Sequence, residues 1–165
     1  NNFLMYKDLI NSSDELGVDG VLVVDIPGEL SLKDYGIDNK DLDIISLVSP
    51  TTSKERIQRI AKNSSGFIYY VTLRGVTGSS NLDGNEIEQN IQYIKSISTT
   101  PVMAGFGIKT KDDAKLLSSF SDGIVIGSSI VELIHKNSEN KVDFFSDFTQ
   151  LNYIKITSFS IGGKN

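Results

Sequence analysis

The chain has 165 residues and a mass of 18.1 kDa, which is the size of one domain. Its hydrophobic share of 39% and its 14 glycines are typical of a globular protein, and its net charge of -5 argues against a surface that binds nucleic acid or anionic membranes. With no cysteine and a single histidine, His135, it offers no disulfide, no thiolate metal site and no multi-histidine zinc site.

Targeting signals are also missing from the sequence. No apolar run reaches the roughly 18–20 residues that a membrane-spanning helix needs. Residues 1–5 lack the basic segment and apolar core of a signal peptide. The absence of cysteine fits a reducing compartment, so we expect a cytoplasmic protein without membrane contact.

Hydrophobic periodicity predicts alternating helices and strands along the chain. In chain order the predicted elements are a helix over 4–16, strands over 20–26 and 43–49, a helix over 53–61, a strand over 66–73, a helix over 86–97, a strand over 101–105, a helix over 111–117, a strand over 123–127 and a helix over 129–134. Ser53 is the expected cap of the second of these helices, and isoleucines 87, 91, 94 and 97 form one stripe along the third.

This alternation predicts an α/β fold with a parallel sheet, because the strands are almost continuously apolar and therefore buried on both faces. The arrangement is either a (β/α)8 barrel or a doubly wound sheet. A closed barrel usually needs about 250 residues. If the fold is a barrel, we expect the chain to supply a partial barrel of about five parallel strands, in one domain without a linker.

Glycines gather where the predicted strands end, which is where α/β folds bind their ligands. A polar loop at 74–84 follows the third strand, Gly105 and Gly107 follow the fourth, and Gly127 and Ser128 follow the fifth and lead into a helix. Free backbone amides at such a helix start are suited to phosphate. The alternative is that these glycines only turn the chain and that the loop is a surface excursion rather than a lid.

Four segments resemble the tryptophan synthase alpha chain family in order and spacing between about residues 2 and 137. Segment 17–27 resembles the family's fourth strand, Arg74-Gly75-Val76-Thr77-Gly78 its mobile active-site loop, and segments 101–108 and 122–131 its seventh and eighth strands. Other phosphate-binding barrels share the last two segments, but the Gly-Val-Thr-Gly loop distinguishes this family. The resemblance implies a (β/α)8 barrel that cleaves indole-3-glycerol phosphate to indole and glyceraldehyde 3-phosphate, needs no cofactor of its own, and passes indole to a beta chain.

The resemblance also implies roles for individual residues. Phosphate would be bordered by Gly105, Phe106 and Gly107 and bound by Gly127 and Ser128. The remaining substrate-binding residues would be Tyr69 in the pocket, Thr77 and Gly78 on the closing loop, and Leu22 near the indole ring.

The chain departs from the family pattern in two respects. The arginine that the family has two residues before the first glycine of the loop is shifted here to Arg74, with Leu73 in its place. The two catalytic carboxylates of the family belong to segments that would precede Asn1, so the resemblance covers a C-terminal portion without the first three βα units. Asp25, at the end of a strand, is the one weak catalytic candidate, and His135 is expected to be a surface residue without a catalytic role.

Several functions therefore remain open. The first is a lyase of the tryptophan synthase alpha type whose catalytic carboxylates are missing from this chain, so that the chain alone is inactive. The others are a non-catalytic phosphate-binding half-barrel and another phosphate-sugar barrel enzyme, such as an isomerase. Residues 1–140 are expected to form the partial barrel and 141–165 a weakly matched tail. Because an open parallel sheet leaves edge groups unpaired, we also expect self-association, pairing with the N-terminal units, or weak stability.

Overall fold

The computed structural model of the protein describes residues 17–24, 27–35, 41–72, 84–105, 108 and 110–127. The described elements follow one another as β1 (Gly20–Val21), η1 (Leu32–Tyr35), β2 (Asp43–Ile44), β3 (Ser46–Val48), α2 (Lys54–Asn63), β4 (Ile68–Val71), α3 (Gly84–Ile97), β5 (Val102–Gly105), α4 (Lys111–Ser118) and β6 (Gly123–Val125). The helices predicted over 4–16 and 129–134, and the tail from 141, lie outside the described residues. No helix in the described part is long and apolar enough to cross a membrane.

All described strand pairs are parallel and follow the order of the chain. β1 pairs with β2, and β3, β4, β5 and β6 pair in that sequence. Only Ile45 separates β2 from β3, and its amide donates to the Val21 carbonyl at 2.9 Å. The extended segment that contains β2 and β3 therefore pairs with β1 along its first half and with β4 along its second half. Counted as one strand, this segment joins β1, β4, β5 and β6 to give the five predicted parallel strands.

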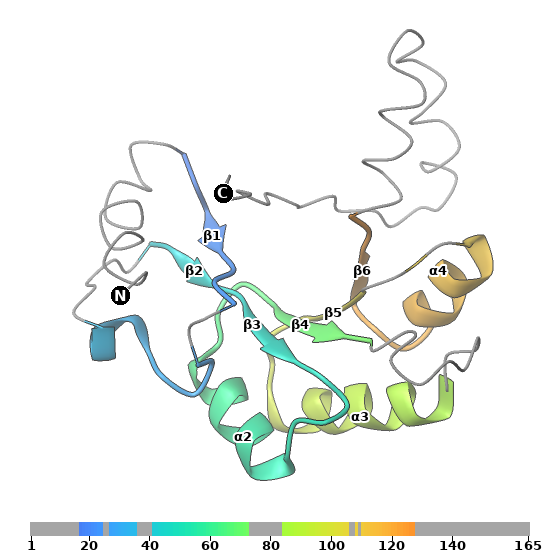
Figure 1. Ribbon diagram of the computed structural model, residues 1–165, viewed down its shortest axis with the longest axis horizontal. Coiled ribbons are helices and arrows are strands. Elements are labelled where there is room, and N and C mark those ends of the chain that lie inside the picture. The colour runs from blue at the N-terminus through green and yellow to red at the C-terminus, as the bar shows by residue number, and fades with distance from the viewer. Residues whose placement is uncertain are drawn as a thin grey trace, which may run out of the picture.

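The three α-helices among the described residues pack on one face of the sheet. In Figure 1, α2, α3 and α4 lie along the same side of the strands, and each contacts the strand that precedes or follows it. Their buried side chains meet alternate residues of the strands in one apolar core. The core consists of Val48, Ile57, Ile60, Ile68, Tyr70, Ile87, Ile91, Ile94, Val102, Ala104, Ile108, Ala114, Leu117, Phe120, Ile124 and Ile126.

The other face of the sheet carries the side chains that alternate with this core. Leu47, Tyr69, Val71, Met103 and Val125 point to that face and are only partly buried in the structure. No helix among the described elements packs on it. This one-sided covering is what a barrel wall shows when its interior is left open.

Helix starts agree with the sequence. The Ser53 hydroxyl caps α2 by accepting from the Arg56 amide at 3.3 Å. α4 begins with a capping box in which the Thr110 hydroxyl accepts from the Asp113 amide at 3.1 Å and the Asp113 carboxylate accepts from the Thr110 amide at 3.0 Å. Of the predicted stripe on α3, Ile87, Ile91 and Ile94 are buried, whereas Ile97, the last residue of the helix, is 39% exposed.

Candidate functional site

The carboxyl ends of β4, β5 and β6 lie side by side. Val71 pairs with Gly105, and Gly105 pairs with Val125. The Gly105 carbonyl accepts two hydrogen bonds from Thr72, one from its amide at 2.8 Å and one from its buried hydroxyl at 3.0 Å. These bonds fix the point where the chain leaves β4 for the loop over 73–83, although that loop lies outside the described residues.

Tyr69 and Gly105 form a close pair on the open face of the sheet. A Cβ atom added to Gly105 would lie 3.0 Å from the Tyr69 hydroxyl and would collide with the Val125 carbonyl oxygen. Packing therefore requires glycine at position 105. The Tyr69 ring fills the space that a side chain at position 105 would need. The structure thus places Tyr69, on β4, beside Gly105 at the carboxyl end of β5.

The Tyr69 hydroxyl is in a state suited to ligand contact. Burial raises the pKa of the Tyr69 phenol, so the hydroxyl stays protonated at neutral pH and can donate a hydrogen bond. Its neighbour Tyr70 points to the opposite face, is fully buried and accepts a hydrogen bond from the Asn90 side chain at 3.0 Å. Of the two tyrosines, only Tyr69 faces the open side of the sheet.

Gly127 differs from Gly105 in its surroundings. Among the residues that the structure describes, no heavy atom would lie within 4 Å of a Cβ atom added to Gly127, and the φ of Gly127 is not in the left-handed region. Neither packing nor backbone conformation in the described part requires glycine there. A requirement for close approach of a ligand to the backbone would explain it.

The other predicted site residues are placed as follows. Leu22 follows β1 and is 39% exposed. Asp25, Thr77, Gly78, Phe106, Gly107 and Ser128 lie outside the described residues. The structure thus brings Tyr69 and Gly105 together, and it neither supports nor contradicts the roles of the six residues outside the described part.

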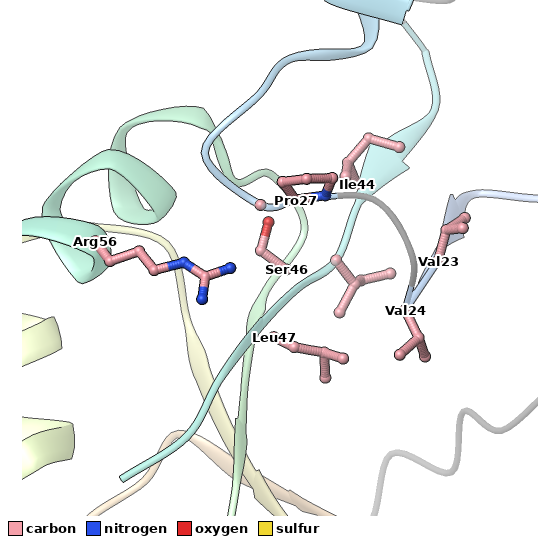
Figure 2. Close-up of a pocket in the computed structure, with 9 residues that line it drawn as sticks. Val23, Val24, Pro27, Ile44, Ser46, Leu47 and Arg56 are labelled. Atoms are coloured by element: carbon pink, nitrogen blue, oxygen red, sulfur yellow. The ribbon is translucent and has the colours of Figure 1, made fainter. Parts of the chain in front are cut away.

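A cavity of about 180 Å³ lies between the end of β1 and β3 and was not anticipated from the sequence. It is lined by Val23, Val24, Pro27, Gly28, Ile44, Ile45, Ser46, Leu47 and Arg56. Figure 2 shows Arg56 and Ser46 on one side of the β3 ribbon and Leu47 and Val24 on the other. The cavity therefore has a polar end toward α2 and an apolar end toward the open face of the sheet.

An ion pair fastens the loop that borders this cavity to α2. The Glu29 carboxylate accepts hydrogen bonds from the Arg56 guanidinium, and its backbone carbonyl accepts one from the Asn63 side chain at 2.5 Å. The hydrogen bond from Arg56 lowers the pKa of the Glu29 carboxyl, so the pair stays charged at neutral pH. Because 27 residues separate the two partners, no short-range pattern indicates this contact.

The described residues contain no group of three or more acidic, histidine or cysteine side chains that could hold a metal ion. Their polar side chains at the strand ends are instead hydroxyls, such as those of Tyr69 and Thr72. Hydroxyls and backbone amides can bind a neutral or phosphorylated ligand, but they are not an acid–base pair.

Comparison with known proteins is consistent with this arrangement. The sequence matches the family described as "Tryptophan synthase alpha chain" over residues 3–156. It is 42% identical over 129 residues to the tryptophan synthase alpha chain of Acinetobacter baumannii strain ATCC 17978, and the match covers 77% of this chain and 48% of that protein. The chain thus spans about half the length of this curated relative.

Solved structures agree with the sequence match. Tryptophan synthase subunit alpha from Campylobacter jejuni superposes with a TM-score of 0.72 at 26% identity, covering 87% of this chain and 58% of that one. A structure of the tryptophan synthase α2β2 complex from Pyrococcus furiosus superposes with a TM-score of 0.69 at 27% identity, covering 86% and 58%. These relatives are (β/α)8 barrels, and the parallel strands described above are a part of that fold. The chain belongs to the tryptophan synthase alpha chain family.

Proposed function

We propose that this chain supplies the phosphate- and indole-binding wall of a lyase that cleaves indole-3-glycerol phosphate to indole and glyceraldehyde 3-phosphate in tryptophan biosynthesis. The family match over residues 3–156 carries the proposal. The contact of the Tyr69 side chain with Gly105, at the carboxyl end of β5, supports it, because ligands of α/β barrels bind at that end.

In this proposal the phosphate binds after β5 and β6, among the backbone groups of Gly105, Phe106, Gly107, Gly127 and Ser128. Gly127 is the best supported of these residues, because packing does not account for its lack of a side chain. A phosphate held by backbone amides at a helix start is further stabilised by the helix dipole. Tyr69 donates a hydrogen bond to the substrate, and Leu22 contacts the indole ring.

Two further residues would act by closing the site. Thr77 and Gly78 belong to the loop that follows Thr72, and the hydrogen bonds of Thr72 to Gly105 anchor its start beside the bound phosphate. Closure of such a loop excludes water from the reacting atoms.

The reaction breaks the carbon–carbon bond between indole and the glycerol phosphate chain. It requires a proton delivered to the indole ring and a proton removed from the glycerol hydroxyl, which is work for a pair of carboxylates. We place these carboxylates in the segment of the relatives that this chain does not match, so that the 165 residues bind the substrate without turning it over. Asp25 is retained as a weak candidate for one of the two roles.

The Pyrococcus furiosus relative takes part in an α2β2 complex. We propose that the whole protein to which this fold belongs likewise delivers indole to a beta chain. Within this part of the chain, the phosphate site is the feature that can be tested first.

The test uses Gly127, because a Cβ atom added there would meet no heavy atom of the described residues within 4 Å. Calorimetric titration with glycerol 3-phosphate should show binding to the wild-type chain and its loss in Gly127→Asp, where the carboxylate repels the phosphate. The isosteric but neutral Gly127→Asn should lose much less. Equal affinity of the Asp and Asn variants would refute the phosphate site.

The catalytic part of the proposal has its own assay, in which indole release from indole-3-glycerol phosphate is followed. No release by the wild-type chain, with phosphate binding intact, agrees with carboxylates located outside it. Release by the chain alone would mean that a group such as Asp25 carries the chemistry. A chain that binds phosphate but never releases indole, even with the missing segment supplied, would instead be a non-catalytic phosphate-binding half-barrel.

A further inference from the structure

The segment that follows β1 has few contacts of its own to hold it. β1 ends at Val21, whose carbonyl accepts a hydrogen bond from the Ile45 amide at 2.9 Å. Within the described part of the chain, residues 22–24 make no backbone hydrogen bond, and the side chains of Leu22 and Val24 are 39% and 73% exposed. The position of this segment therefore depends on contacts made further along the chain.

A turn over 27–30 provides such contacts, because it packs against both α2 and β3. The turn is closed by a hydrogen bond of 3.0 Å from its last amide to its first carbonyl. A Cβ atom added to Gly28 would lie 3.1 Å from the Ser46 Cβ atom and 3.3 Å from the Ile60 side chain. Contacts this close prevent the turn from moving toward the sheet, so only movement away from the sheet needs a further restraint.

Glu29 supplies this restraint through two residues of α2. Its carboxylate accepts hydrogen bonds from the Arg56 guanidinium, and its backbone carbonyl accepts one from the Asn63 side chain at 2.5 Å. The Glu29 side chain is only 19% exposed, whereas that of Arg56 is 54% exposed. Exposed ion pairs contribute little to stability, but a largely covered carboxylate that loses its guanidinium partner has to move toward water. Removal of the Arg56 guanidinium should therefore release the turn.

The segment held in this way borders the cavity between the end of β1 and β3. Figure 2 shows Val24 and Leu47 at the apolar end of this cavity and Arg56 at its polar end. Because Val24 follows β1 and Leu47 belongs to β3, the width of the apolar end depends on how the segment after β1 is placed. Leu22 lies two residues before Val24, so a movement of the turn displaces both side chains together.

We propose that Arg56 is a positioning residue for the indole end of the site. Through Glu29 it holds the turn over 27–30 on α2, and the turn fixes Leu22 and Val24 opposite β3. This inference rests on the proposed function, because it names a residue that orders the indole-binding side of the same site.

The effect of Arg56 is confined to one end of the site. The proposed phosphate groups lie at Gly105, on β5, and at Gly127, after β6, and β4 separates them from β3 in the sheet. Loss of the ion pair should therefore weaken the binding of indole and leave the binding of phosphate unchanged.

Three variants separate the ion pair from the general charge of the helix. Arg56→Gln removes the guanidinium. The reversed pair, Glu29→Arg with Arg56→Glu, restores an ion pair of opposite sense. Lys62→Gln is the matched control, because it removes one positive charge from an exposed position of the same helix.

Hydrogen exchange of backbone amides, followed by NMR, reports directly on the turn. The Leu30 amide donates within the turn, whereas the Asp122 amide donates to the Val102 carbonyl at 2.8 Å and reports on the sheet. We expect the Leu30 amide to exchange at least tenfold faster in Arg56→Gln, at the wild-type rate in Lys62→Gln, and close to that rate in the reversed pair. The Asp122 amide should exchange at the wild-type rate in every variant.

Titrations with indole and with glycerol 3-phosphate test the positioning itself. Indole fluorescence provides the signal for the first titration, because the chain has no tryptophan. Arg56→Gln should bind indole at least fivefold less tightly, and the reversed pair should recover most of this loss. All variants should bind glycerol 3-phosphate equally, whereas a role in stability alone would change both affinities by the same factor.

The inference is overturned by an unchanged Leu30 exchange rate in Arg56→Gln, or by an equal loss of affinity for the two ligands. Faster exchange with wild-type indole affinity also overturns it, because the turn would then be held without positioning the site. Failure of the proposed function gives a different result, in which the wild-type chain binds neither ligand. That result removes the indole site and its positioning by Arg56 together, whatever the exchange rates show.

Discussion

Replacing Gly105 by alanine tests the packing that positions the strand ends. Gly105 sits between β4 and β6, paired with Val71 on one side and Val125 on the other. The added Cβ atom would collide with the Val125 carbonyl and lie 3.0 Å from the Tyr69 hydroxyl. Tyr69 can yield by a change of rotamer, but the carbonyl can move only if β6 shifts relative to β5.

The size of the effect follows from this geometry. One methyl group forced against a backbone atom costs about 1–3 kcal/mol. We expect the upper half of that range for Gly105→Ala, because a shift of β5 also strains the two hydrogen bonds from Thr72 to the Gly105 carbonyl. For a domain of this length, about 1 kcal/mol lowers the melting temperature by about 2–4 °C.

The matched control is Gly127→Ala, since no heavy atom in the described part of the chain lies within 4 Å of a Cβ atom added there. The free energy of unfolding of both variants is measured by urea titration followed by circular dichroism, with equal m-values as the check on two-state behaviour. We expect Gly127→Ala to change stability by less than about 0.5 kcal/mol. Equal stability of the two variants would refute the steric reasoning for Gly105.

Two further predictions concern the core and the end of the sheet opposite the site. Ile91→Ala removes a side chain with no exposed surface and should cost about 2–5 kcal/mol in the urea assay, whereas Ile97→Ala, on the same helix but 39% exposed, should cost less than about 1 kcal/mol. Burial alone raises the pKa of Asp122, but hydrogen bonds from Lys95 at 2.6 Å and from the Val102 amide at 2.8 Å outweigh it, and the net pKa lies below the ordinary value of 3.8. The carboxylate therefore stabilises the fold above pH 3.8 and loses this effect as the pH falls through its lowered pKa. Asp122→Asn should cost about 1 kcal/mol at pH 7, and this cost should shrink as the pH falls through the lowered pKa of the wild-type carboxyl; a cost that does not change with pH would contradict this reasoning.

The order of elements was predictable because its signals are local. Apolar runs mark the strands, and Ser53 marks the start of α2 at the position the structure confirms. The extent of the strands was less predictable. The apolar run over 20–26 predicted a long strand, but β1 is Gly20–Val21, because strand length depends on pairing. Likewise the run over 43–49 appears as β2 and β3, because its two halves pair with different neighbours.

The same distinction between local and long-range contacts applies to the residues of the candidate site. Sequence motifs indicated Tyr69 and Gly105 as site residues. The two residues lie close together because β4 and β5 are neighbouring parallel strands. The Glu29–Arg56 pair and the cavity beside it have no counterpart in the sequence pattern, because each joins segments that are not neighbours in the chain. Periodicity indicates which face of an element is buried, but not which distant side chain meets it.

The glycines show how structure can separate packing from binding where sequence cannot. Gly105 and Gly127 both follow the pattern of a phosphate site, and the sequence offers no reason to distinguish them. In the structure a side chain at 105 would collide with the neighbouring strand, so packing between the strands is sufficient to explain the glycine at this position. A Cβ atom at 127 would meet no heavy atom of the described residues within 4 Å, so packing in that part of the chain does not account for this glycine. Stability should therefore depend on position 105 and phosphate affinity on position 127, and the two effects can be measured in the same chain without the segment that we expect to carry the catalytic carboxylates.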